Sequence, residues 1–216
     1  MRTAAFFDMD HTLVNGNTGS LFMRWKRERG EVRRADFLRY LRFLAQYSVG
    51  AIDATELREK AASSLRGTDV EAFDAELEGW YERLVRPLIT EAAKREVERR
   101  RARGDVLVVL SASLPFAVRP LAEDLSIGHV ICSEFEVDDG RFTGRFAKLC
   151  YGAAKVEAAV GFAREHGIDL ERSAFYTDSV SDLPLLRCVG EPRIVNPDPR
   201  LHLHARRQGW RIETWS

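Results

Sequence analysis

The chain has 216 residues, of which 45% are hydrophobic and 31% are charged, a composition typical of a folded globular protein and unlike that of disordered or low-complexity chains. Its 33 Lys and Arg residues balance its 33 Asp and Glu residues, so the formal net charge is zero. General binding to nucleic acid or to an anionic membrane relies on an excess of basic residues. We therefore expect neither nucleic acid nor a stable membrane contact as a partner.

The cysteines and the N-terminal segment indicate a cytoplasmic protein. The three cysteines lie far apart and form no Cys-x-x-Cys pair, which argues against a disulfide framework and a zinc site. The apolar stretch at the N-terminus is interrupted by Asp8 and Asp10, unlike a signal peptide. The uncharged run at residues 106–118 is shorter than the roughly 20 residues that a transmembrane helix needs.

Short apolar runs alternate with longer helical patterns along the chain. Runs of this length that are rich in Val, Ile and Phe are typical of buried strands. Their alternation with helices predicts an α/β protein with a parallel sheet. The expected strands are residues 3–7, 105–110, 129–132, 173–177 and 193–195.

Polar residues follow three of these expected strands. Asp8, Ser111 and Asp178 each come directly after an apolar run. In open parallel sheets, ligands bind beyond the carboxyl ends of the strands. The three side chains are therefore expected at one edge of the sheet, where a ligand would bind.

A helical insertion is expected after the first strand, because the stretch before the second strand is far longer than a crossover requires. Apolar residues at helical spacing predict an amphipathic helix within it. A second helix is expected over residues 69–86, after Thr68 or Asp69 as the cap, and a third over 88–102, with Pro87 suited to its first turn. The apolar positions of the first helix are Phe37, Tyr40, Leu41, Leu44 and Tyr47.

These elements divide the chain into a core and a cap. We assign residues 1–14 and 88–216 to the core and residues 15–87 to a helical cap that would set substrate specificity. A second, smaller insertion at residues 135–146 alternates apolar and polar residues around Asp139-Gly140, which predicts a β-hairpin.

The Arg-rich segment KREVERRRAR (94–103) is expected to form an exposed helix face. Such a face is supported by ion pairs between residues four apart, for example Glu96 with Arg100.

The segment after the first strand carries two carboxylates. Asp8 and Asp10 are two residues apart, so both would face the same side of an extended chain. Neighbouring carboxylates repel each other unless a cation or a shared proton intervenes. Mg²⁺ fits, because it binds through a few carboxylates together with water and substrate phosphate. The alternative is that the pair simply ends the strand and caps the next turn.

Further polar residues recur at strand ends and helix starts. Asp178 and Asp182 follow a later strand, where either could also serve as a helix cap. Ser111 precedes a helix with Pro115 in its first turn, a place where an anion can bind, although Ser111 could also be an ordinary cap. Lys155 lies in the first turn of a helix, where its charge opposes the helix dipole. It is therefore either a functional cation or a surface lysine.

The order of these segments resembles the haloacid dehalogenase superfamily of phosphohydrolases. The segments are DMDHTL (8–13), SASLP (111–115), YGAAKVEAA (151–159) and TDSVSDLP (177–184). Within the superfamily the chain resembles the phosphoserine-phosphatase-like group, subfamily IB, which carries a helical C1 cap after the first strand. This resemblance implies a Rossmann-like, three-layer core with a parallel sheet.

The resemblance also implies a role for each polar residue. Asp8 is expected to be the nucleophile and Asp10 the general acid and base. Ser111 and Lys155 are expected to hold the phosphate. The implied cofactor is Mg²⁺, bound by Asp8, Asp10 and Asp178, with Asp182 supporting the metal site.

Two positions depart from the family pattern. Phosphoserine phosphatases usually carry a Glu nine residues after the nucleophile, which meets the ammonium group of the substrate, whereas this chain has Asn17. A neutral amide cannot form that ion pair, so Asn17 is a candidate specificity residue and phosphoserine is disfavoured. The usual Gly before Asp178 is Thr177.

The resemblance predicts a Mg²⁺-dependent phosphatase that hydrolyses a small phosphomonoester through an aspartyl-phosphate. Candidate substrates include histidinol phosphate and other amino-alcohol phosphates. The alternatives are a non-enzymatic phosphoacceptor or binding protein, a phosphotransferase, and a lipid-headgroup phosphatase. The sequence does not predict the oligomeric state.

Overall fold

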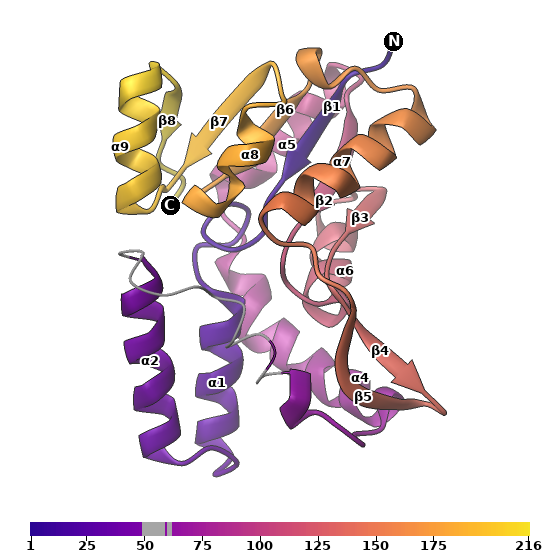
Figure 1. Ribbon diagram of the computed structural model, residues 1–216, viewed down its shortest axis with the longest axis vertical. Coiled ribbons are helices and arrows are strands. Elements are labelled where there is room, and N and C mark those ends of the chain that lie inside the picture. Colours follow the sequence, from indigo (N-terminus) through magenta and orange to yellow (C-terminus); the bar gives the residue numbers. More distant parts are fainter. Residues whose placement is uncertain (49–58, 60–61) are drawn as a thin grey trace.

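The computed structural model describes residues 1–48, 59 and 62–216 (Figure 1). Within these residues, six strands form one sheet in the order β3-β2-β1-β6-β7-β8. All neighbouring pairs in this sheet run parallel, which confirms the expected α/β fold. The strands are β1 (Ala4–Phe7), β2 (Val106–Leu110), β3 (His129–Ile131), β6 (Ala174–Thr177), β7 (Glu191–Val195) and β8 (Arg211–Glu213).

The expected strands agree with the first four of these to within one residue at either end. Strand β7 begins two residues earlier than expected; Glu191 and Pro192 were missed because neither is a residue type typical of a buried strand. Strand β8 was not predicted. It is three residues long, carries a charge at each end, and lies at the edge of the sheet, so it lacks the apolar run of a central strand.

Helices cover both faces of the sheet and complete a three-layer core. Alternate residues of β1 face opposite sides, so Ala5 and Phe7 join one apolar cluster and Ala4 and Phe6 join the other. The first cluster includes side chains of α5 (Glu91–Ala102) and α6 (Pro115–Asp124). The second includes side chains of α7 (Ala153–His166), α8 (Leu183–Leu186) and α9 (Pro199–Gln208).

The described residues between β1 and β2 form mainly helices, as expected (Figure 1). Asp69 caps one of its helices, accepting a hydrogen bond from the Ala72 amide. Helix α5 begins three residues later than expected, because Thr90 caps it and Pro87 lies in a preceding 3₁₀ turn. The predicted amphipathic helix is α2, and Leu44 and Tyr47 lie within it. The side chains of these two residues are not among those that the structure describes. The elements are α1 (Thr18–Glu28), α2 (Arg34–Ser48), α4 (Val70–Trp80), a π-helical turn (Tyr81–Val85) and the 3₁₀ turn (Arg86–Leu88).

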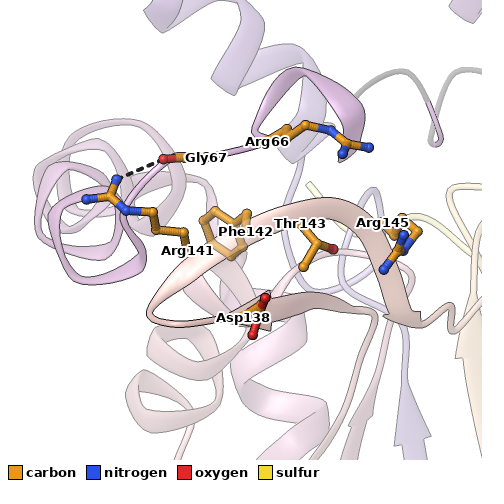
Figure 2. A pocket seen from close by; sticks show the side chains of 7 residues that line it. All are labelled: Arg66, Gly67, Asp138, Arg141, Phe142, Thr143 and Arg145. Atoms are coloured by element: carbon orange, nitrogen blue, oxygen red, sulfur yellow. Dashed lines mark hydrogen bonds between the residues drawn. The ribbon is translucent and has the colours of Figure 1, made fainter.

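The expected hairpin is formed by β4 (Glu134–Asp138) and β5 (Arg141–Lys148), with Asp139 and Gly140 at positive φ in the turn. Three backbone hydrogen bonds tie it to residues 67–70 of the helical stretch. A shallow hollow lies beside this junction and is distinct from the polar edge of the sheet (Figure 2). Its lining residues are Arg66, Gly67, Asp138, Arg141, Phe142, Thr143 and Arg145.

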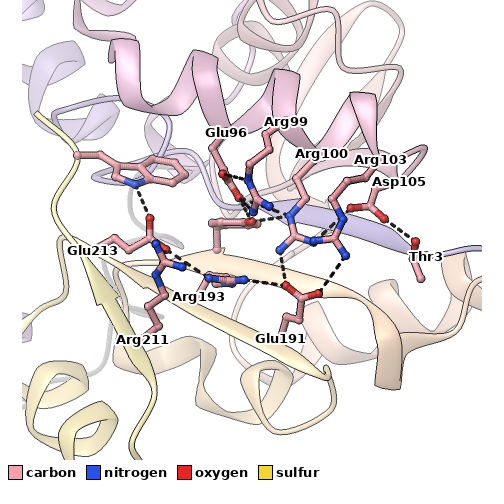
Figure 3. A network of polar contacts seen from close by, with 12 residues as sticks. Thr3, Glu96, Arg99, Arg100, Arg103, Asp105, Glu191, Arg193, Arg211 and Glu213 are labelled. Carbon is pink, nitrogen blue, oxygen red and sulfur yellow. Dashed lines mark hydrogen bonds and ion pairs between the residues drawn. The ribbon is translucent and has the colours of Figure 1, made fainter.

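The prediction that residues 94–103 form an exposed face was wrong for Arg100, which is 1% exposed. Figure 3 shows its side chain among those of Glu96, Asp105 and Glu191. Its guanidinium donates to the Tyr176 hydroxyl at 2.6 Å, to Glu191 at 2.6 Å and to Asp105 at 3.2 Å. The expected pair with Glu96 is present at 3.4 Å. The buried charge is thus paired and hydrogen-bonded, as a buried arginine requires.

The position of Arg100 follows from the helix period. Ala93, Val97 and Arg100 are the buried residues of α5, and their spacing of four and then three places them on one stripe against the sheet. The other arginines of the last turn lie off this stripe. Arg100 therefore occupies a position that an apolar residue would usually take.

The Arg100 network predicts a pH-dependent contribution to stability. The hydrogen bond from Arg100, opposed by burial and assisted by Arg193, lowers the pKa of Glu191 to about 2 from 4.5. A lowered carboxyl pKa stabilises the fold above the unfolded value, and this stabilisation is lost as the pH falls toward the folded value. Glu191→Gln should lower the free energy of unfolding at neutral pH by about 1–3 kcal/mol.

The difference in unfolding free energy between wild type and Glu191→Gln should become smaller below pH 4.5. Urea denaturation across a pH series measures this difference. Glu98→Gln is the matched control, because the Glu98 side chain is 68% exposed. It should change stability by less than about 0.5 kcal/mol. Equal behaviour of the two variants at every pH would contradict the assigned role of Arg100.

Candidate active site

Three polar residues lie beyond adjacent strands at one edge of the sheet. Asp8 follows β1, Ser111 follows β2 and Asp178 follows β6, and β1 lies between the other two strands (Figure 1). Asp8 and Ser111 are buried. Because parallel strands end on the same side, the fold places these side chains where α/β proteins bind ligands.

A buried lysine joins two of the neighbouring carboxylates. Lys155, in the first turn of α7, is 2% exposed and is therefore not a surface lysine. Its Nζ lies 3.1 Å from Oδ2 of Asp8 and donates to Oδ2 of Asp182 at 2.8 Å. Burial alone would lower the pKa of Lys155, but the charges of Asp182 and Asp8 outweigh burial and raise it, so the ammonium stays charged.

Asp182 is held from two sides. Besides Lys155, the Thr177 hydroxyl donates to its Oδ2 at 2.7 Å, while Oδ1 is buried without a hydrogen-bond partner among the described residues. Burial raises the pKa of this carboxyl despite the Lys155 charge. Thr177, which replaces the usual glycine, thus has a structural role: its hydroxyl also accepts from the Ser179 amide at 3.2 Å.

The Asp10 carboxylate accepts hydrogen bonds from residues at the start of helix α1. The Thr18 amide donates to Oδ1 at 2.9 Å, and the Asn17 side-chain amide donates to Oδ2 at 3.2 Å. Burial raises the pKa of Asp10, the hydrogen bonds from Thr18 oppose this, and the charge of Asp8 adds to it, so the net shift is upward. A raised pKa makes it easier for a carboxyl group to hold a proton at a given pH.

The fourth carboxyl, Asp178, has the least compensated charge. Burial raises its pKa well above the ordinary value, and the charges of Asp8, Asp182 and Asp10 raise it further. No described residue donates a hydrogen bond to its side chain, and within the described part of the chain Lys155 forms the only ion pair with any of the four carboxylates. The cluster therefore lacks positive charge.

The donor chemistry of this cluster fits Mg²⁺. Within the described residues, no three side chains of His, Cys, Asp or Glu gather closely enough to hold a metal by themselves. Mg²⁺ does not need such a cage, because it is usually bound by one or two carboxylates with water and substrate phosphate. A divalent cation would also offset the repulsion around Asp178 and engage buried oxygens such as Oδ1 of Asp182.

Two residues that support this edge were missed by the sequence reasoning. Thr18 holds Asp10 through its backbone amide, and Asn196 donates through its side chain to the carbonyls of His11 and Trp215, each at 2.9 Å. Asn is a preferred helix N-cap residue, so Asn17 could have located Thr18 as the first residue of α1. Asn196 gave no comparable signal, because its contacts are distant in sequence.

Three histidines occupy two different places in the fold. His202 and His204 are in α9, where His204 packs against Trp210 at 5.3 Å between ring centroids. His11 is at the edge itself, with a positive φ of 53° that lets the chain turn sharply after Asp10.

No helix in the described part of the chain is long and apolar enough to cross a membrane.

Comparisons with known proteins show which family and fold this chain resembles. The family model of haloacid dehalogenase-like hydrolases matches residues 5–187. A probable phosphatase of Mycobacterium tuberculosis is 32% identical over 100% of this chain and 76% of its own length. The histidinol-phosphatase of Neisseria meningitidis is 29% identical over 98% of both chains.

Solved structures share the fold. A protein of unknown function from Bordetella pertussis aligns with a TM-score of 0.86 at 28% identity, covering 98% of both chains. A phosphoserine phosphatase, solved as a phospho-aspartyl intermediate analogue, aligns with a TM-score of 0.74 at 22% identity, over 98% of this chain and 92% of the other. At that identity the second likeness shows the fold alone.

The buried lysine provides a direct test of the site's electrostatics. Lys155→Met removes the cation between Asp8 and Asp182 and leaves two buried carboxylates unpaired. The variant should lose about 3–5 kcal/mol of unfolding free energy, measured by urea denaturation in EDTA so that no metal compensates. Lys94→Met is the control, because the Lys94 side chain is 48% exposed. Equal stability of the two variants would refute the pairing.

Proposed function

The chain belongs to the haloacid dehalogenase-like hydrolase family and is a phosphoric monoester hydrolase, and we propose that it is a Mg²⁺-dependent phosphatase that uses Asp8 as its nucleophile. The observation that carries this proposal is the buried Lys155, which lies 3.1 Å from Asp8 at the edge where adjacent strands end. A dianionic phosphate needs charge neutralisation and positioning before a negative nucleophile can approach it.

In the proposed first step, a carboxylate oxygen of Asp8 forms a bond to phosphorus as the bond from phosphorus to the leaving oxygen breaks. Asp10 donates its proton to that leaving oxygen, and the product alcohol departs. Asp10, now a carboxylate, then takes a proton from water as the water oxygen attacks phosphorus. Inorganic phosphate leaves, and Asp8 is free again. The covalent intermediate divides one difficult displacement into two easier ones.

The phosphate would be held by Ser111 and Lys155. Ser111 is buried at the end of β2, ahead of the N-terminus of α6, where free backbone amides favour an anion. Lys155 contributes a positive charge 3.1 Å from Oδ2 of Asp8. Mg²⁺, which Asp8, Asp10 and Asp178 would hold with support from Asp182, supplies further positive charge against the phosphate oxygens when bound.

We propose residues 15–87 as the cap that encloses the leaving group. Helix α1 supports this, because it begins at Asn17 and Thr18, which hold Asp10. A small amino-alcohol phosphate such as histidinol phosphate is the proposed substrate. One fact supports it: a histidinol-phosphatase of similar length is among the relatives.

Asp8→Asn tests the nucleophile. The amide keeps the shape of the side chain but cannot attack phosphorus, so turnover of para-nitrophenyl phosphate with Mg²⁺ should fall by at least about 10³-fold. Asp139→Asn, in the exposed hairpin turn, is the matched control and should retain activity. If Asp8→Asn turns over at a near-normal rate, the proposed role of Asp8 is wrong.

Metal removal tests the cofactor. EDTA should abolish turnover and added Mg²⁺ should restore it, because the four carboxylates need a cation. Asp178→Asn should weaken Mg²⁺ binding by at least about tenfold, measured by calorimetry on the protein without substrate. Full activity in EDTA, or unchanged Mg²⁺ affinity in Asp178→Asn, would count against the proposed metal site.

A further inference from the structure

We propose that Asn17 is a positioning residue that fixes the Asp10 carboxyl for proton transfer, and that Tyr40 of helix α2 holds Asn17 in place. This inference rests on the proposed function, because it assigns a role behind the proposed general acid and base. It differs from the expectation that Asn17 is a substrate-specificity residue, and the two roles lead to different kinetic behaviour.

The orientation of the Asn17 amide is determined by its neighbours. Its Oδ1 accepts a hydrogen bond from the Ser20 backbone amide at 2.9 Å and another from the Ser20 hydroxyl at 3.0 Å. A backbone N–H can only donate, so the amide oxygen must face Ser20. The Nδ2 group therefore points toward Oδ2 of Asp10, at 3.2 Å.

Asp10 is consequently held at both oxygens by consecutive residues of one helix start. Thr18 donates to Oδ1 through its backbone and Asn17 donates to Oδ2 through its side chain. Two donors fix both the position and the plane of a carboxyl group, whereas one donor leaves it free to rotate. Proton transfer to a leaving oxygen depends on such placement, with a tolerance of roughly 0.5 Å.

Tyr40 brings a second helix into the arrangement. Its hydroxyl lies 3.4 Å from Oδ1 of Asn17 and 3.5 Å from Oγ of Ser20. Gly19 permits this approach, because a Cβ atom at that position would lie 2.9 Å from the Tyr40 hydroxyl. Helices α1 and α2 thus meet at the group that orients Asp10.

The same contacts explain why Asn17 is poorly suited to bind an ammonium group. The atom that would accept from an ammonium is Oδ1, and it already accepts from Ser20 and Tyr40. The chain has therefore used this position to support the acid and base, where the phosphoserine phosphatases carry a Glu that meets the substrate.

Asn17→Asp and Asn17→Ser test the proposal without removing the helix cap, because Asp and Ser are both good N-cap residues. Asp replaces the donor to Asp10 with an acceptor, and Ser is too short to reach it. Asn15→Asp is the matched control, since it makes the same change at an exposed residue two positions earlier. Thermal unfolding establishes that each variant is folded.

The readout is kcat/KM for two aryl phosphates of similar shape, with Mg²⁺ present. Phenyl phosphate has a poor leaving group that needs a proton, and para-nitrophenyl phosphate has a good one that does not. Both Asn17 variants should lose at least about tenfold on phenyl phosphate and under about threefold on para-nitrophenyl phosphate, with KM nearly unchanged. The ratio of kcat/KM on phenyl phosphate to kcat/KM on para-nitrophenyl phosphate should also fall in Tyr40→Phe, by a smaller factor. Asn15→Asp should leave this ratio unchanged.

Equal losses on the two substrates, or a rise in KM with unchanged kcat, would overturn the positioning role and favour a structural or substrate-binding one. Failure of the wild type to hydrolyse either phosphate would instead count against the proposed function itself.

Discussion

The interaction on which the site depends is the buried ammonium of Lys155, which lies between Asp8 and Asp182. Four carboxyl groups gather at one edge of the sheet, and burial together with their mutual repulsion opposes the charged state. Lys155 offsets part of this cost and ties the loop after β1 to the loop after β6. The negative charge that remains uncompensated is the basis of the proposed cation site.

The parallel sheet fixes the positions of these side chains. Strand β1 is central, so the nucleophile candidate is flanked by the ends of β2 and β6 on a rigid sheet. The chain then turns sharply at His11 and enters helix α1, whose first residues return to hold Asp10. The helical stretch that would cover a substrate and the carboxyl that would protonate its leaving group are therefore joined within a few residues.

Much of the core was predictable because central parallel strands are continuous apolar runs, and the polar residue after each run marks the ligand-binding edge. Asp8, Ser111 and Asp178 were located in this way. The resemblance implied that Lys155 holds the phosphate, but the pairing of Lys155 with Asp8 was not predicted, since no local pattern connects residues so far apart. Support from Asn196 was missed for the same reason.

Other differences have local causes. Strand β8 has charged ends, because an edge strand does not need an apolar run. Arg100 occupies a core-facing position, and helical periodicity judged from apolar residues alone cannot detect a buried charge that finds Tyr176 and Glu191 as partners. Asn17 illustrates a third limit: the sequence identifies a departure from the family pattern, whereas the structure shows what the new side chain contacts.

The central claim is that a carboxylate at this edge attacks phosphorus before water does. The stereochemical course at phosphorus tests it most directly, using a phosphomonoester made chiral with oxygen isotopes and turned over in isotopically labelled water. Each in-line displacement inverts the configuration, so transfer to Asp8 followed by transfer to water predicts net retention. Net inversion would mean that water attacks the substrate directly, and it would contradict the account.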